Sequence, residues 1–131
     1  MEMISVKTFR VAACVLLCCL VLGFVSTALV APALQWHTDR LYYDNLNRIV
    51  IEGYFYNSGT RTITWVNWYD AKVYFRQHNT GWWLQAEGMY HDLPIYLEPG
   101  DSIRWKFRIT DAGYSYFDYY DVQWNVNYQY R

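Results

Sequence analysis

Two segments near the C-terminus alternate strictly between apolar and polar residues. The first, 103–109, places Ile, Trp or Phe at odd positions and Arg or Lys at even positions. In the second, 122–130, Val, Trp and Tyr alternate with Gln and Asn. A period of two is typical of a strand with one face on a core and the other in solvent. The chain is therefore constrained to form sheets with an apolar face.

Similar apolar stretches upstream predict further strands at 48–56, 61–68, 71–76, 82–86 and, as an irregular edge strand containing Pro94, 93–97. Turn residues separate them. Asn57 and Gly59 follow the first of these strands, and Pro99 with Gly100 precedes the alternating strand 103–109. Asn, Pro and Gly each favour a particular turn conformation.

This pattern predicts an all-β fold of seven or eight short strands, with no amphipathic helix outside the N-terminal segment. The expected architecture is an immunoglobulin-like antiparallel β-sandwich over 34–131, and a small barrel is the alternative. Residues 35–131 hold 25 of the 27 aromatic residues, because only Phe9 and Phe24 lie earlier. Each buried ring removes about 150–250 Å² from water, so the domain has material for a core without crosslinks.

The N-terminal segment carries no charge from Val11 to Leu34 and directly follows Lys7 and Arg10. Two alternatives fit this layout. One is a signal peptide over 1–33, cleaved after Ala33 in an Ala31-Pro-Ala33 motif. The other is an uncleaved helical anchor over 11–31, since about 20 apolar residues cross a bilayer. Both place the remaining chain outside the cytoplasm, either secreted or in the cell wall, or anchored in the cytoplasmic membrane.

Cysteine usage and charge exclude several functional classes. All three cysteines, Cys14, Cys18 and Cys19, lie in the apolar segment, so the exported part has no disulfide, thiol nucleophile or Cys-type zinc site. The exported part has nine Lys and Arg against eleven Asp and Glu, a net charge of −2 once Lys7, Arg10 and Glu2 are set aside. It contains no basic block, so nucleic acid is not expected as a partner.

One stretch resembles a known family. The segment V-I-E-G-Y-F-Y-N at 50–57, followed by a turn, an apolar strand and Y-L-E-P-G-D-S-I-R-W-K-F at 96–107, resembles the SLAP domain of bacterial S-layer-associated proteins. It is similar, more loosely, to FxLYD-type envelope domains. The resemblance spans about half of the chain and rests on turn and strand signals. It implies an exported, non-enzymatic module at a bacterial cell surface.

Signals for catalysis or a cofactor are weak. The exported histidines, His37, His78 and His91, are scattered, and no serine lies in a nucleophile-elbow setting. Glu87 and the His91-Asp92 pair offer metal ligands, but neighbours in an extended chain point to opposite faces. We therefore expect no enzyme activity, no cofactor and no metal site.

The surplus of aromatic residues is the better lead to function. The candidate binding surface comprises Trp82, Trp83, Tyr114, Tyr116, Tyr119 and Tyr120. Exposed Trp and Tyr side chains fit a protein partner, where such residues dominate binding energy, or a glycan, on whose CH groups rings stack. The same rings also suit a small core. Within each doublet, adjacent residues of a strand point to opposite faces, so one ring of Trp82-Trp83 faces outward.

The basic row of Arg104, Lys106 and Arg108 has two interpretations. It forms either a solvated strand face or a contact for anionic wall polymers. Taken together, the sequence predicts an exported cell-envelope module that binds a cell-envelope protein or wall glycan and performs no catalysis. The alternative is a small carbohydrate-binding module that uses exposed Trp and Tyr residues. Membrane contact is expected only through 11–31, if that segment stays uncleaved.

Overall fold

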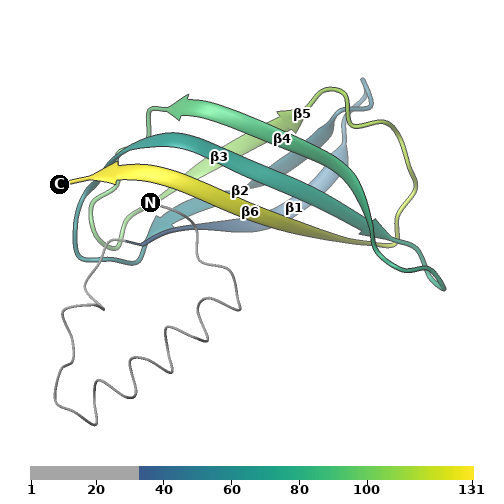
Figure 1. The fold of residues 1–131 in the computed structure, drawn as a ribbon, viewed down its shortest axis with the longest axis horizontal. Helices are drawn as coiled ribbons and strands as arrows, with labels where there is room; N and C mark the ends of the chain where they lie inside the picture. Colours follow the sequence, from purple (N-terminus) through teal and green to yellow (C-terminus); the bar gives the residue numbers. More distant parts are fainter. Residues whose placement is uncertain (1–32) are drawn as a thin grey trace, which may run out of the picture.

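The computed structural model describes residues 33–131, and in this part of the chain it contains six strands and no helix (Figure 1). The strands are β1 (Leu34–Tyr43), β2 (Ile49–Asn57), β3 (Ile63–Arg76), β4 (Trp83–Leu93), β5 (Ser102–Ile109) and β6 (Tyr119–Tyr130). They form two antiparallel sheets of three strands, in the order β1-β2-β5 and β4-β3-β6. The expected N-terminal hydrophobic helix, with Lys7, Arg10 and Ala31, lies outside the described residues.

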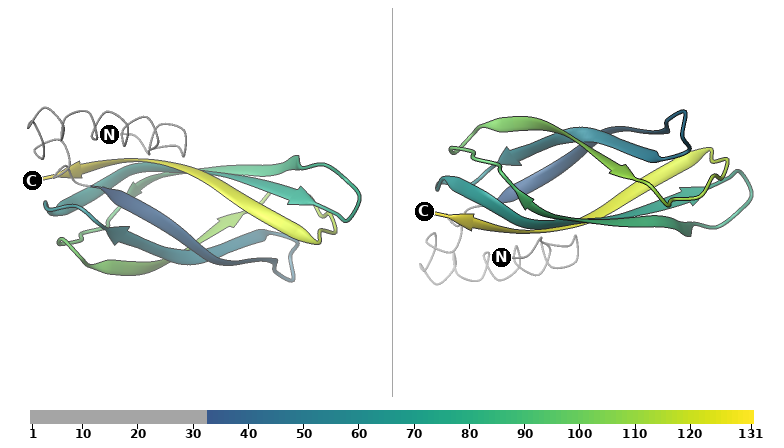
Figure 2. Two further views of the ribbon diagram at one scale, coloured as in Figure 1. Left: turned by 90° about the horizontal axis from the view of Figure 1, so that it is seen from below. Right: turned by 90° about the horizontal axis from the view of Figure 1, so that it is seen from above.

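The two sheets stack as two layers (Figure 2). Buried side chains from both sheets form one core between them. The chain passes between the sheets after β2, after β4 and again after β5, and β1 contacts β6 while β4 contacts β5. Because all pairings are antiparallel, three connections meet at one end of the molecule, on the right in Figure 1. These connections are 44–48, 77–82 and 110–118.

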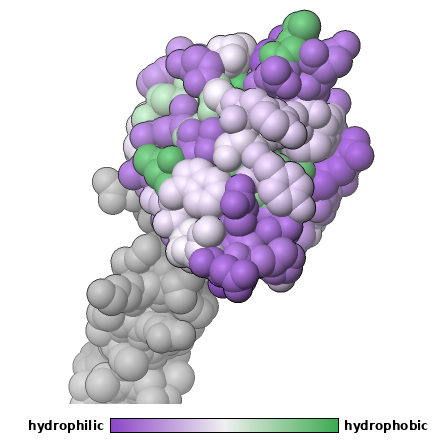
Figure 3. Space-filling view, turned by 90° about the vertical axis from the view of Figure 1, so that its right-hand side faces the viewer, coloured by the Kyte–Doolittle hydropathy of each residue, from purple (hydrophilic) through white to green (hydrophobic). Residues whose placement is uncertain are grey.

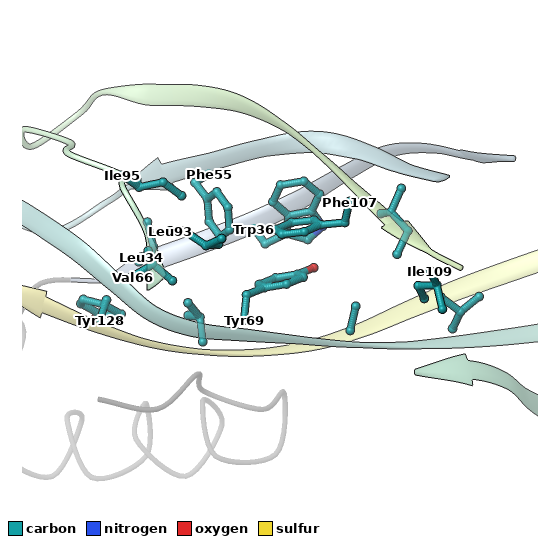
Figure 4. Close-up of a cluster of buried hydrophobic side chains, with 14 of the residues drawn as sticks. Leu34, Trp36, Phe55, Val66, Tyr69, Leu93, Ile95, Phe107, Ile109 and Tyr128 are labelled. Atoms are coloured by element: carbon teal, nitrogen blue, oxygen red, sulfur yellow. The ribbon is translucent and has the colours of Figure 1, made fainter. Parts of the chain in front are cut away.

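The centre of the core is a group of four aromatic side chains (Figure 4). Trp36, Phe55 and Phe107 come from β1, β2 and β5, and Tyr69 comes from β3 of the other sheet. Tyr69 stacks on Phe107 with ring centroids 4.3 Å apart, and Trp36 lies 4.9–5.5 Å from the other three rings. Edge and offset contacts of this kind add to the hydrophobic stabilisation of aromatic burial.

Gly53 explains how β1 packs against β2. The register of β1 shifts between Thr38 and Arg40, and Gly53 of β2 is the partner of Thr38. A Cβ atom at Gly53 would lie 1.9 Å from the carbonyl oxygen of His37, so no larger residue fits. Glycine within a strand often marks such a close approach of backbones.

The strand count of seven or eight was wrong, since the described residues form six strands. The expected strands 61–68 and 71–76 are one continuous strand, β3, because Tyr69 and Asp70 between them stay paired with both β4 and β6 instead of forming a turn. The segment 93–97 is not a strand. Its Leu97 makes only an isolated bridge to Ile63, and the amide of Ile95 donates to the carbonyl of Leu93 in a tight turn around Pro94. Strand β1, which the alternation did not predict, completes the first sheet.

Candidate binding surface

The two aromatic doublets divide their rings between the core and the surface. Phe75 of β3 faces Trp83 of β4 and Tyr120 of β6 in the strand register. These three side chains point inward, and the rings of Phe75 and Trp83 lie 6.3 Å apart with edges to faces. Since side chains alternate along a strand, the neighbouring rings of Trp82 and Tyr119 point outward. They are 49% and 43% exposed.

Arg76 lies between these two outward rings. Its guanidinium carbon is 5.3 Å from the centre of the Trp82 ring and 4.6 Å from the centre of the Tyr119 ring. Both distances are within the range of favourable cation–π contacts. The Nε atom of Arg76 is buried and has no hydrogen-bond partner, and no carboxylate of the described residues pairs with the guanidinium. Trp82, Arg76 and Tyr119 thus form an outward row across the end of the β4-β3-β6 sheet, with an unpaired charge at its centre.

A polar network extends this row into the two neighbouring loops. The His78 ring packs edge-on against Tyr119 at 5.4 Å. Asp118 accepts hydrogen bonds from the His78 backbone N–H at 2.8 Å and from the Tyr116 hydroxyl at 2.8 Å. Both bonds favour the ionised carboxylate of Asp118 and so lower its pKa. The bond to Asp118 also favours the protonated hydroxyl of Tyr116, which raises the pKa of Tyr116. The network joins loop 110–118 to loop 77–82 and holds Tyr116 beside the row.

Inner contacts hold loop 110–118 in place. The Tyr43 hydroxyl donates to the Gly113 carbonyl at 2.8 Å and accepts from the Ser115 N–H at 3.1 Å. Tyr114 rests its ring on Tyr43 at 4.9 Å and is otherwise largely exposed. Phe117 stacks on Phe75 at 4.1 Å. Contacts with Tyr43 and Phe75 therefore anchor loop 110–118 to the sheets, and Tyr114 is exposed on its outer side.

Gln85 links the inner ring of Trp83 to the same loop. Its side-chain oxygen accepts from the Trp83 indole N–H at 2.8 Å, and its amide nitrogen donates to the Ala112 carbonyl at 2.9 Å. Trp83 and Tyr120 are thus half-buried and support the loop from below.

We call the surface above them the aromatic end. It is formed by Arg76, Trp82, Tyr114, Tyr116 and Tyr119. Figure 3 faces it and shows nearly white side chains among strongly hydrophilic ones.

The turn residues singled out in the sequence meet at the opposite end. Asn57 is fully buried, and its amide nitrogen donates to the carbonyls of Arg61 and Leu97 at 2.7 and 3.0 Å. Its side-chain oxygen accepts from the Gly59 N–H at 3.0 Å. Gly100, which follows Pro99, has a φ of +85° and donates its N–H to the Asn57 carbonyl at 2.8 Å. These residues close the sandwich-like fold rather than form a ligand surface.

The outer face of the β1-β2-β5 sheet pairs its charges. Glu52 accepts from Arg40 at 3.0 and 3.1 Å and from the Tyr42 hydroxyl at 2.6 Å, and Lys106 lies 3.3 Å away. The hydrogen bonds from Arg40 and Tyr42 lower the pKa of Glu52 to about 2. Arg104 pairs with Asp39 at 2.9 Å. Two of the three residues of the basic row are therefore neutralised within the sheet, which favours the solvated-face interpretation.

Asp70 is a different kind of charge on the outward side of β3. It is 7% exposed, and its Oδ1 atom has no hydrogen-bond partner. Burial, together with the neighbouring Glu87 carboxyl, raises the pKa of Asp70 to about 6. The described residues contain no group of three His, Cys, Asp or Glu side chains that could hold a metal ion.

The predicted cleavage point lies at the start of the first sheet. Ala33, the residue before that point, accepts hydrogen bonds at its carbonyl from the backbone and side chain of Ser58, at 3.0 and 3.2 Å. Strand β1 begins at the next residue, Leu34. Within residues 33–131, no helix has the length and apolar character needed to cross a membrane.

In comparisons with known proteins, no family model, curated protein or solved structure matches the chain. The resemblance to SLAP and FxLYD-type domains therefore stays a prediction. Any function assigned to the chain rests on its own side chains.

Proposed function

We propose that the chain is an exported, non-catalytic module of the cell envelope that binds a partner protein through its aromatic end. We further propose that its two packed sheets are an immunoglobulin-like sandwich related to the SLAP and FxLYD-type domains. The uncharged stretch 11–34 after Lys7 and Arg10 supports export by cleaved signal or anchor. The packed sheets support a scaffold that presents loops at one end.

The row of Trp82, Arg76 and Tyr119 carries this proposal. Trp, Tyr and Arg are the residue types that dominate the binding energy of protein interfaces. Here they come from the end of β3, the start of β6 and the residue just before β4, and they lie side by side, with half-exposed rings and an unpaired guanidinium. The fold itself gives this guanidinium two ring contacts and no carboxylate among the described residues. A partner carboxylate or carbonyl that accepts from the terminal nitrogens of Arg76 would pair its charge.

Non-catalytic action is supported by the positions of the titratable groups. His37 lies 3.7 Å from Asp39 on β1, and His78 lies 3.5 Å from Asp118 at the other end of the molecule. Both pairs lie at the surface, and within residues 33–131 no serine hydroxyl hydrogen-bonds to either histidine. General acid–base catalysis needs the base, its orienting group and a reacting atom within hydrogen-bond reach of one another.

Photo-crosslinking in the native host tests the proposal. We would replace Tyr114 by p-benzoylphenylalanine in the full-length chain, because this side chain is exposed at the aromatic end. The matched control carries the same replacement at Tyr96, which is half-exposed in the segment between β4 and β5. The proposal predicts a discrete protein adduct from position 114 that is absent from position 96 and weakened at least about threefold by Arg76→Met.

Three results would overturn this assignment. Equal adducts from both positions would place the contact elsewhere, and an adduct insensitive to Arg76→Met would remove the row from the interface. An absence of any protein adduct from position 114 would reject a protein partner at this end.

A glycan is the second candidate ligand for the aromatic end, because the Trp82 and Tyr119 rings lie in a row rather than scattered. Soluble wall glycans would then quench Trp fluorescence. Trp82→Ala is the informative variant, since Trp83 points inward and supports the loop. Quenching that survives Trp82→Ala would exclude this surface as a glycan site.

A further inference from the structure

A second surface, at the end of the molecule opposite the aromatic end, has the features of a ligand site. A depression of about 420 Å³ opens on the outer face of the β1-β2-β5 sheet. Its lining residues are Gln35, Trp36, His37, Tyr54, Tyr56 and Ser102. Neither the alternation of the strands nor the aromatic doublets point to this set.

The strand register explains why these side chains meet. Tyr54 and Tyr56 are two residues apart on the central strand β2, so both rings project from the same face about 7 Å apart along the strand. Gln35 and Ser102 are the partners of Tyr56 on the two flanking strands. His37 is the partner of Tyr54 on β1, and their rings lie 5.0 Å apart. Two tyrosine rings thus lie between rows of hydrogen-bonding side chains.

Four of the polar side chains that line this depression are free, and His37 lies 3.7 Å from Asp39. Among the described residues, none of the side chains of Gln35, Tyr54, Tyr56 and Ser102 hydrogen-bonds to another residue. The lining also lacks a permanently charged group, and the nearest cation of the register, Arg104, is already paired with Asp39 at 2.9 Å. The surface therefore offers rings, hydroxyls and an amide without a net charge.

These features narrow the chemistry of the ligand. An anion would find no free cation, because Arg104 is engaged. An apolar ligand would bury several unpartnered polar groups, at a cost of about 1–3 kcal/mol for each. A ligand with apolar CH faces and many hydroxyls uses both the rings and the free polar groups. We propose that this depression binds a neutral saccharide of two or more linked sugars, stacked across Tyr54 and Tyr56.

This site is separate from the aromatic end, so either proposal can fail while the other stands. The test is a calorimetric titration of the full-length chain, kept in solution with a detergent that has no sugar headgroup. Calorimetry needs no reporter ring in the depression, and the ring of the lining residue Trp36 points into the core. The probes are cellohexaose, chitohexaose and mannohexaose, and hexagalacturonate serves as the charged comparison.

We expect saturable binding of at least one neutral probe, with weaker binding of hexagalacturonate. Tyr56→Ala should raise the Kd at least about tenfold, which corresponds to a loss of ~1.4 kcal/mol. Gln35→Ala, at an exposed position, should raise it less. Tyr96→Ala is the matched control, because this exposed tyrosine lies outside the depression, and its Kd should equal that of the wild type.

Several outcomes would overturn the proposal. One is the absence of saturable binding with every neutral probe. Another is binding that Tyr56→Ala and Gln35→Ala leave unchanged while circular dichroism shows both variants folded. Binding that disappears only with Trp82→Ala would move the saccharide to the aromatic end, and tighter binding of hexagalacturonate would contradict the neutral ligand.

Discussion

Two carboxylates occupy equivalent places in the two sheets and have opposite environments. Glu52 and Asp70 each lie on the central strand of a sheet with the side chain on its outer face. Glu52 is held by Arg40, Tyr42 and Lys106, and its pKa falls to about 2. Asp70 is buried with one oxygen unpartnered, and its pKa rises to about 6.

The difference extends beyond these two groups. On the β1-β2-β5 face, charges satisfy one another and stabilise the fold. On the β4-β3-β6 face, one strand carries both Asp70 and Arg76 with atoms that have no partner. Because unpartnered buried polar groups cost stability, the fold itself gains nothing from them. The charged pairs of the β1-β2-β5 face therefore stabilise the fold, whereas strand β3 of the other sheet carries charged groups that the fold leaves incompletely partnered.

The largest expected effect separates the inner ring of a doublet from its outer ring. Trp83→Ala removes a half-buried ring that packs on Phe75 and hydrogen-bonds Gln85. We expect it to lower the unfolding free energy by about 2–3 kcal/mol. Trp82→Ala removes only a half-exposed ring and should cost less than about 1 kcal/mol. Urea unfolding of both variants measures the difference, and equal losses would show that Trp82 is also structural.

Asp70→Asn should stabilise the protein at neutral pH. The folded-state pKa of about 6 lies above the ordinary 3.8, so folding favours the protonated carboxyl. The stabilising contribution of Asp70 is therefore complete below pH 3.8, where its carboxyl is protonated, and the wild-type protein loses this contribution as the pH rises through about 6 and Asp70 ionises. The variant should therefore be more stable than wild type above pH 6, on the order of 1 kcal/mol. The gain should vanish below pH 3.8. A gain that persists at about pH 3 would argue against the raised pKa.

Glu52→Gln should show the opposite pH dependence. The pKa of about 2 lies below the ordinary 4.5, so the carboxylate stabilises the fold above pH 4.5. That contribution is lost as the pH falls from 4.5 towards about 2. The variant should unfold at lower urea concentrations than wild type at neutral pH, by a smaller margin in high salt. The two midpoints should converge at about pH 2. Identical midpoints at neutral pH would show that this network contributes nothing.

Arg104→Ala should have the smallest effect. Its side chain is largely exposed, and its pair with Asp39 is open to solvent. Pairs of this kind contribute little, so we expect a change in unfolding free energy below about 0.5 kcal/mol. Thermal unfolding at low and high salt is a sufficient measurement. A loss near that of Trp83→Ala would mean that Arg104 supports the sheet in some further way.

The all-β class followed from alternation, but bulges hid part of the strand pattern. In β1 the buried Leu34 and Trp36 are followed by Leu41, because the register shifts between Thr38 and Arg40. The period of two is broken there, so the pattern predicted no strand. In β3, register shifts between Ile63 and Trp65 and between Val66 and Trp68 also break the period of two, and there one strand was predicted as two. A single extra residue reverses the facing of all that follow.

The candidate site was only partly predictable, because alternation does not give the register between strands. Alternation alone indicates that one ring of each doublet faces outward. Which ring does so depends on the pairing of Phe75 with Trp83 and Tyr120. This pairing is set by how the strands assemble and cannot be deduced from one strand alone. The place of Arg76 between the outward rings depends on the same register. Alternation places Tyr54 and Tyr56 on one face of β2, but the depression around them needs both flanking strands.

The most direct test of the central claim is the unfolding free energy of Arg76→Met. Methionine keeps a long side chain between the Trp82 and Tyr119 rings but removes the unpaired charge. The lost cation–π contacts, about 0.5–1 kcal/mol each, are offset by relief of the buried, unpartnered Nε. If the charge serves a partner rather than the fold, the variant should lie within about 1 kcal/mol of wild type. A loss of about 3 kcal/mol or more would show that Arg76 is structural and would contradict its role in binding a partner.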